Sequence, residues 1–100
     1  MHEHYLIKKE AVKVLSGAGY SEEREDVQTD CFGSIHTIFA KGNKMVRLVW
    51  DGKGGCGFAQ VLDGAKWVDI KAYVPESGEK EFMENIQKLC EALGEALNHG

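Results

Sequence analysis

The sequence lacks the features that mark membrane and secreted proteins. It has no apolar run that approaches the roughly 20 residues needed to cross a bilayer. Its first residues, Met1-His2-Glu3-His4-Tyr5, have neither the basic start nor the apolar run of a secretory signal. We therefore expect a cytoplasmic protein that does not contact a membrane.

Cysteine is scarce and unevenly placed. The three cysteines, Cys31, Cys56 and Cys90, are widely spaced, and no Cys-x-x-Cys motif occurs. A secreted disulfide scaffold would hold a denser and even-numbered set. The pattern predicts three free thiols in a reducing compartment.

The chain also lacks an excess of positive charge. Its 12 Lys and Arg residues against 16 Asp and Glu residues give a net charge of −4, which argues against nucleic-acid binding through overall charge, although Lys41, Lys44 and Arg47 form a small basic group. The acidic residues gather in segments 21–30 and 75–100. Such segments are typical of solvated surface, and the alternative is an acidic surface that steers a basic partner.

The chain has 100 residues, and 43% of them are hydrophobic. This content is enough for one small folded domain over residues 1–100. Apolar residues at helical spacing predict an N-terminal helix over 5–16 and a C-terminal helix that begins after Ser77 as N-cap. Residues 20–31 fit either a short helix or a strand around Val27. Alternating residues predict four strands: 32–40, 45–50, 56–62 and 66–74. The fold class is therefore α+β, with a helix, a four-stranded antiparallel meander and a second helix.

The Gly42-Asn43 pair predicts the register of the first hairpin. A two-residue loop there places Phe39 opposite Val46, and Ile35 opposite Trp50. In the fourth strand, Val68, Ile70, Ala72 and Val74 alternate with polar and aromatic residues, and we expect these four to form the floor of the core.

No motif for catalysis or for a cofactor stands out. Residues 52–57 spell G-x-G-x-x-G, but that motif binds phosphates only where a helix follows, and here a strand is predicted. His2 and His4 lie at a terminus that we expect to be flexible, and two ligands do not make a metal site. No nucleophile–base pair can be assembled. We expect no catalytic residue, no metal and no cofactor.

One face of the predicted sheet is too apolar for plain solvated surface and too polar for a core. It carries His36, Ile38, Met45, Arg47, Val49, Trp67, Asp69, Lys71 and Tyr73. Residues of the types Trp, Tyr, Arg and Met are enriched at contact surfaces.

Three interpretations of this face remain open. One helix covers each face of the sheet, or the face binds a second copy or another protein, or it forms the floor of a pocket with His36, Arg47 and Asp69 as polar anchors. The first hypothesis for function is a non-catalytic interaction module, a homodimer that binds a macromolecular partner through an acidic or aromatic surface, as immunity or regulator proteins do. The alternative is a module that binds a small apolar ligand between sheet and helix, and an enzyme ranks third.

Overall fold

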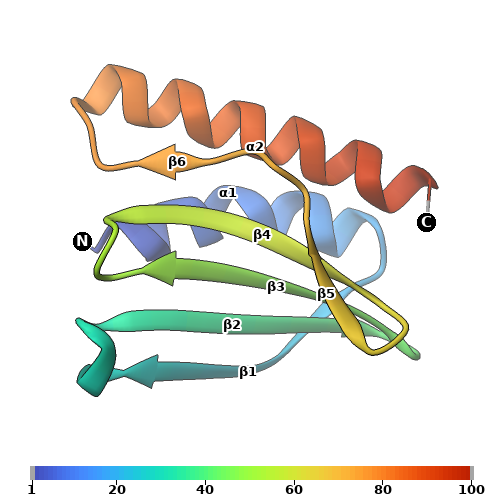
Figure 1. The fold of residues 1–100 in the computed structure, drawn as a ribbon. Helices are drawn as coiled ribbons and strands as arrows, with labels where there is room; N and C mark the ends of the chain where they lie inside the picture. Colours follow the sequence, from blue (N-terminus) through green and yellow to red (C-terminus); the bar gives the residue numbers. More distant parts are fainter. Residues whose placement is uncertain (1, 100) are drawn as a thin grey trace.

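The computed structural model describes residues 2–99, apart from the side chains of Cys31 and His99. The chain forms two long helices at its ends, with strands and one short 3-10 turn between them (Figure 1). In chain order the elements are α1 (Glu3–Gly17), β1 (Ser21–Gln28), η1 (Thr29–Cys31), β2 (Ser34–Lys41), β3 (Lys44–Asp51), β4 (Cys56–Asp63), β5 (Lys66–Asp69), β6 (Val74–Pro75) and α2 (Glu79–His99).

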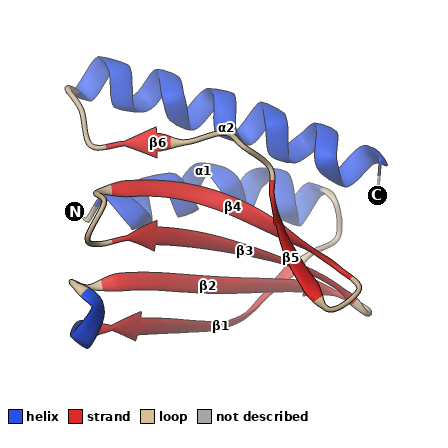
Figure 2. Cartoon of the chain, viewed as in Figure 1, coloured by secondary structure: helices blue, strands red, loops and turns tan. Residues whose placement is uncertain are grey.

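The strands form one antiparallel sheet, and the predicted α+β class is confirmed. The order across the sheet is β1-β2-β3-β4-β5, and β6 also pairs with β4 (Figure 2). Consecutive strands are neighbours, as expected for a meander. The number of strands differs from the expected four, because the acidic connector forms a strand and the last predicted strand is divided in two.

The β2–β3 hairpin has the register that its loop predicts. Phe39 pairs with Val46 and Ile35 pairs with Trp50, and the strands are joined through Gly42 and Asn43. Gly42 has a φ of 62°, a left-handed conformation that glycine adopts without strain. Because the loop has two residues, it fixes which side chains of both strands share a face.

The acidic segment forms edge strand β1, with a register shift between Glu22 and Arg24. Its side chains are exposed apart from that of Glu25, which is half-buried. Lys8 of α1 lies 2.9 Å from Glu22 and 3.0 Å from Glu25, so its side chain faces β1 and pairs with both carboxylates. Charged side chains on an edge strand also oppose edge-to-edge aggregation.

The predicted strand 66–74 is interrupted. β5 ends at Asp69, and Lys71 has a φ of 61°, which breaks the alternation before β6 begins at Val74. Val68 is 45% exposed at the edge, whereas Val74 is fully buried. Only part of this segment therefore serves as the floor of the core.

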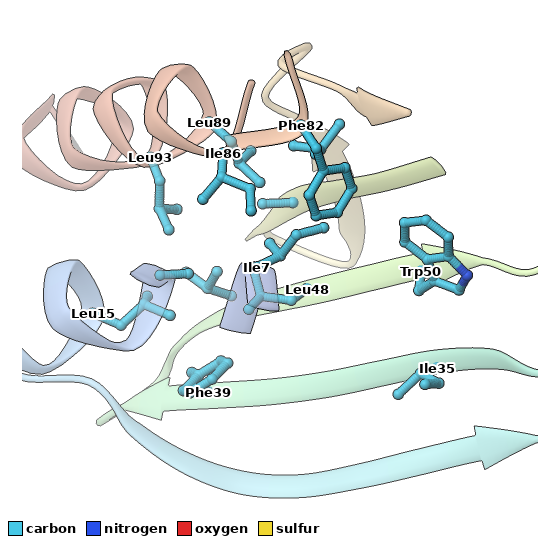
Figure 3. Packing of buried hydrophobic residues seen from close by; sticks show 14 residues of the cluster. Ile7, Leu15, Ile35, Phe39, Leu48, Trp50, Phe82, Ile86, Leu89 and Leu93 are labelled. Carbon is cyan, nitrogen blue, oxygen red and sulfur yellow. The ribbon is translucent and has the colours of Figure 1, made fainter. Parts of the chain in front are cut away.

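Both helices pack against the same face of the sheet and against each other. In Figure 1, α1 lies behind the strands and α2 lies above β4, beside β6. Figure 3 shows Ile7 and Leu15 of α1 between the α2 side chains and those of β2 and β3. The buried cluster contains Ile7, Ala11, Leu15, Ile35, Phe39, Val46, Leu48, Trp50, Ala59, Val74, Phe82, Ile86, Leu89 and Leu93. The interpretation with one helix on each face is therefore wrong.

Two local features concern the helices: the close packing of α1 on β4, and the residue at which α2 begins. Gly57 lies under α1, where a Cβ atom would overlap Cδ1 of Ile7 and lie 3.2 Å from Cε3 of Trp50, so glycine permits the close approach of helix and strand. At the other helix, α2 begins at Glu79 and not directly after Ser77. The Ser77 hydroxyl donates to the carbonyl of Pro75, so the predicted N-cap role of Ser77 is wrong.

Candidate functional site

The face of the sheet opposite the helices carries most of the residues that the sequence predicted for it. Strand pairing aligns Ile38 with Arg47, His36 with Val49, and Arg47 with Gln60. We call this surface the open face, and it comprises Arg24, Asp26, Gln28, Ser34, His36, Ile38, Ala40, Met45, Arg47, Val49, Asp51, Cys56, Phe58, Gln60, Leu62, Trp67 and Asp69. In the described part of the chain, no helix covers it (Figure 1).

Arg47 is held in a fixed place on this face. Its Nε donates to Oε1 of Gln60 at 2.6 Å, and its Cζ lies 4.4 Å from the centre of the Trp67 ring. The side chain therefore spans β4, from β3 to β5. Among the described residues, no carboxylate forms an ion pair with Arg47. Partial burial lowers the pKa of Arg47.

His36 lies beside Arg47 at a shallow concavity of about 230 Å³. The lining residues are Gln28, Ser34, His36, Arg47, Val49, Asp51, Phe58 and Gln60. Burial lowers the pKa of His36, the positive charge of Arg47 lowers it further, and Asp26 opposes both effects. The concavity thus combines a guanidinium cation and an imidazole with an apolar wall of Val49 and Phe58.

The third predicted anchor, Asp69, is engaged elsewhere. Its Oδ1 accepts from the backbone N–H of Lys71 at 2.8 Å, and its Oδ2 accepts from the Tyr73 hydroxyl at 2.8 Å. The Tyr73 ring packs edge-on against Phe58, with 6.1 Å between ring centres. The structure therefore brings His36 and Arg47 together, while Asp69 fastens the 70–73 loop. Lys71 lies in that loop, outside the strand register.

A buried polar cluster under the start of α1 was not found from the sequence. His4 is 1% exposed, so the expectation of a flexible histidine pair is wrong for this residue. The Thr37 hydroxyl donates to Oε1 of Glu25 at 2.6 Å, and it therefore accepts from Nε2 of His4, 2.8 Å away. The only sequence signal was a histidine one turn before Lys8 on the buried stripe of the helix.

This cluster resembles a catalytic set only in its residue types. Thr37 is fully buried, so no substrate reaches its hydroxyl. Tyr5 and Lys8 both donate to Glu25, at 3.1 and 3.0 Å. Burial raises the pKa of Glu25, but these hydrogen bonds and that of Thr37 outweigh it and lower the pKa. The arrangement joins α1 to β1 and β2, and its buried hydroxyl is not accessible to a substrate.

The remaining nucleophile and metal candidates are weak. Cys56 and Cys90 are free thiols, and burial raises the pKa of both, which disfavours the reactive thiolate. Among the described residues, no group of three or more His, Cys, Asp or Glu side chains is placed to hold a metal ion. The glycine-rich turn at 52–57 runs into β4, and Asp51 Oδ1 accepts there from the N–H groups of Lys53 and Gly54, so it does not form a phosphate loop before a helix.

A larger hollow lies on the helical side, between α1 and α2. It has a volume of about 590 Å³, and Val14, Met83 and Cys90 form its apolar part. Met83 is 44% exposed beside it. Charged residues of both signs rim this groove, so it selects no ligand chemistry.

Comparison with known proteins gives no further guide to this site: no family model, no curated protein and no solved structure matches the chain. Within residues 2–99, neither helix is both long and apolar enough to span a membrane.

Proposed function

We propose that this protein is a non-catalytic interaction module whose open face binds a second copy of the chain. The observation that carries the proposal is the position of Ile38 and Val49. They are 6% and 7% exposed, yet they belong to the open face and not to the core cluster. The two side chains form the centre of a second apolar layer, and their neighbours Met45 and Phe58 are half-buried.

The charges of the open face favour a second copy over a strongly charged partner. Arg24 and Arg47 balance most of the charge of Asp26, Asp51 and Asp69, so the face has mixed sign. In a two-fold dimer the same surface of both copies meets. Positive side chains of a mixed-sign face in one copy are then able to lie opposite negative side chains of the other.

The acidic segment 21–30 does not give this face a strong negative charge. Glu22 and Glu25 turn to the helical side, where both pair with Lys8. A basic macromolecule would therefore meet a nearly neutral open face. This distribution is the reason why we place self-association ahead of binding to a basic partner.

The size of the face is adequate for a dimer. Four strands of eight residues, each about 26 Å long, and the four-residue β5, about 13 Å long, lie about 4.8 Å apart and present a flat area of roughly 560 Å², before the relief of side chains is added. A standard protein interface buries about 800 Å² on each partner. Two such sheets pack face to face about 10 Å apart, as in a β-sandwich.

The test is the solution mass of substituted chains, measured by light scattering at micromolar concentration. Val49→Lys and Met45→Lys place a charge on the open face, and Met83→Lys places the same charge on the exposed helical side. We expect dimers from the wild type and from Met83→Lys, and monomers from the two open-face variants.

Met45→Lys is the decisive variant if Val49→Lys fails to fold, because Met45 is only half-buried in the single chain. Circular dichroism checks the fold of each variant. A wild type that is monomeric throughout, or dimers that persist in a folded Met45→Lys variant, would overturn the proposal.

A further inference from the structure

Within one chain, the open face carries a positive charge that is not paired with a carboxylate among the described residues. Arg47 makes one hydrogen bond, to Gln60, and stacks on Trp67, but none of the described carboxylates pairs with it. Removing such a cation from water without an anion is unfavourable. The remaining guanidinium N–H groups of Arg47 are therefore hydrogen-bond donors that an oxyanion would satisfy.

The surroundings of Arg47 are arranged in advance for that anion. The stacking contact with Trp67 and the 2.6 Å bond from Nε to Gln60 fix the plane of the guanidinium. A planar guanidinium presents paired donors that match the two oxygens of a carboxylate. His36 lines the same concavity and can supply a further N–H donor.

The other walls narrow the class of ligand. Val49 and Phe58 give an apolar surface beside the side chains of Arg47 and His36. The volume of about 230 Å³ limits the ligand to a small molecule. Asp51 also lines the concavity, and its negative charge repels a dianion such as phosphate about twice as strongly as a monoanion at the same distance. A single carboxylate on a short apolar body satisfies all of these walls.

We propose that the concavity on the open face binds a small monocarboxylic acid, with the carboxylate on Arg47 and His36 and the apolar body against Val49 and Phe58. One chain supplies every residue that lines this site, and the proposed dimer would enclose the bound acid because it covers the same face. A bound acid would neutralise Arg47 and so lower the cost of covering the face.

The test is an NMR titration of the isotope-labelled full chain at neutral pH. Sodium benzoate is the probe, benzamide is its neutral counterpart, and inorganic phosphate is the dianionic competitor. The indole N–H of Trp67 reports on the site, and that of Trp50, 2% exposed on the helical side of the sheet, is the internal control. We expect benzoate to shift the Trp67 and His36 signals to saturation, while the Trp50 signal stays in place.

Two arginine variants separate the site from general charge. Arg47→Gln removes the proposed anchor. Arg24→Gln removes the same charge from the same face, at a residue that is 3.4 Å from Asp26 and outside the concavity. We expect Arg47→Gln to weaken benzoate binding about tenfold or more, and Arg24→Gln to change it less than about twofold.

Each contrary result has a defined meaning. Equal shifts with benzamide, equal losses in both arginine variants, or tighter binding of phosphate than of benzoate would overturn the monocarboxylate site. Light scattering on the same samples separates the two proposals. Benzoate bound to a monomeric wild type supports the site and contradicts the dimer, whereas a folded, monomeric Met45→Lys variant that leaves benzoate free contradicts the site alone, because Met45 does not line the concavity.

Discussion

Arg47 on β3 reaches across β4 and stacks on Trp67 of β5, with 4.4 Å between Cζ and the ring centre. The two residues are not on neighbouring strands, so this contact fastens the short edge strand to the middle of the sheet. It also holds a cation at the centre of the open face. The contact matters for both proposals, because it fixes the position of the Arg47 guanidinium on the surface that both of them use.

We expect a measurable energetic coupling between these two side chains. In a double-mutant cycle of Arg47→Gln and Trp67→Leu, the coupling in the free energy of unfolding should be about 0.5–1 kcal/mol, as for partly exposed cation–π pairs. The measurement is urea unfolding at one fixed protein concentration. A cycle of Arg24→Gln with Trp67→Leu is the control and should give no coupling, and equal coupling in both cycles would contradict the contact.

The Thr37 hydroxyl should matter more than its volume. Thr37→Val keeps the shape of the side chain but removes the hydroxyl. The Nε2–H of His4, a residue that is only 1% exposed, then has no acceptor, and Glu25 loses one of its hydrogen-bond donors. We expect a loss of about 1–3 kcal/mol in the free energy of unfolding. Thr37→Ser retains the hydroxyl and should lose about 1 kcal/mol or less. If Val were tolerated better than Ser, the hydrogen-bonded cluster would not be a source of stability.

Stability should fall as the solution is acidified below pH 6.5. Burial lowers the pKa of His4 from 6.5 to about 4, although Glu25 opposes this, and Lys8, His2 and His36 add to the lowering. The folded state therefore disfavours protonation of His4, so its contribution is complete above pH 6.5 and is lost as the pH falls towards 4. The loss is about 3 kcal/mol for a shift of this size.

The pH effect of His4 is isolated by comparison with His4→Gln, because other carboxylates also titrate in acid. Urea unfolding of both proteins between pH 7 and pH 4 gives the difference in their free energies. That difference should shrink as the pH falls. A difference that stays constant over this range would show that His4 titrates normally.

Two glycines provide a matched pair of substitutions with opposite signs. Gly57→Ala forces a methyl group into Ile7 and Trp50, and we expect it to destabilise the fold by about 1–3 kcal/mol. Gly94→Ala lies within α2, where the new methyl group would be 3.8 Å from Cγ1 of Val14, and should stabilise by about 0.5–1 kcal/mol. Thermal unfolding of both variants checks the prediction, and a neutral Gly57→Ala would contradict the close packing of α1 on β4.

The parts of the fold that were predictable are those fixed by local chemistry. The two-residue loop at Gly42 set the β2–β3 register, and with it the placement of His36, Arg47 and Val49 on one face. The apolar stripes of both helices predicted their buried sides. These features depend on neighbours that are close in the sequence, and therefore the sequence carries them.

The parts that were missed depend on distant partners. β1 has no apolar alternation, because as an edge strand it is held by pairing with β2 and by Lys8 of α1. The break after Asp69 follows from an aspartate that caps the N–H of Lys71 two residues later, a pattern that the apolar alternation of the segment concealed. Gln28 and Ser34 were not named as residues of this face: a strand around Val27 was only one of two alternatives for the segment that holds Gln28, and Ser34 lies near the beginning of the predicted strand 32–40.

The most direct test of the central claim is an isotope-filtered NOE experiment on a mixture of labelled and unlabelled chains. This experiment detects only contacts between different molecules. We predict intermolecular signals at the methyl groups of Ile38 and Val49, and none at the methyl group of Met83 on the helical side. Intermolecular signals at Met83 with none at Ile38 or Val49, or no intermolecular signals at all, would contradict the assignment of the open face as the binding surface.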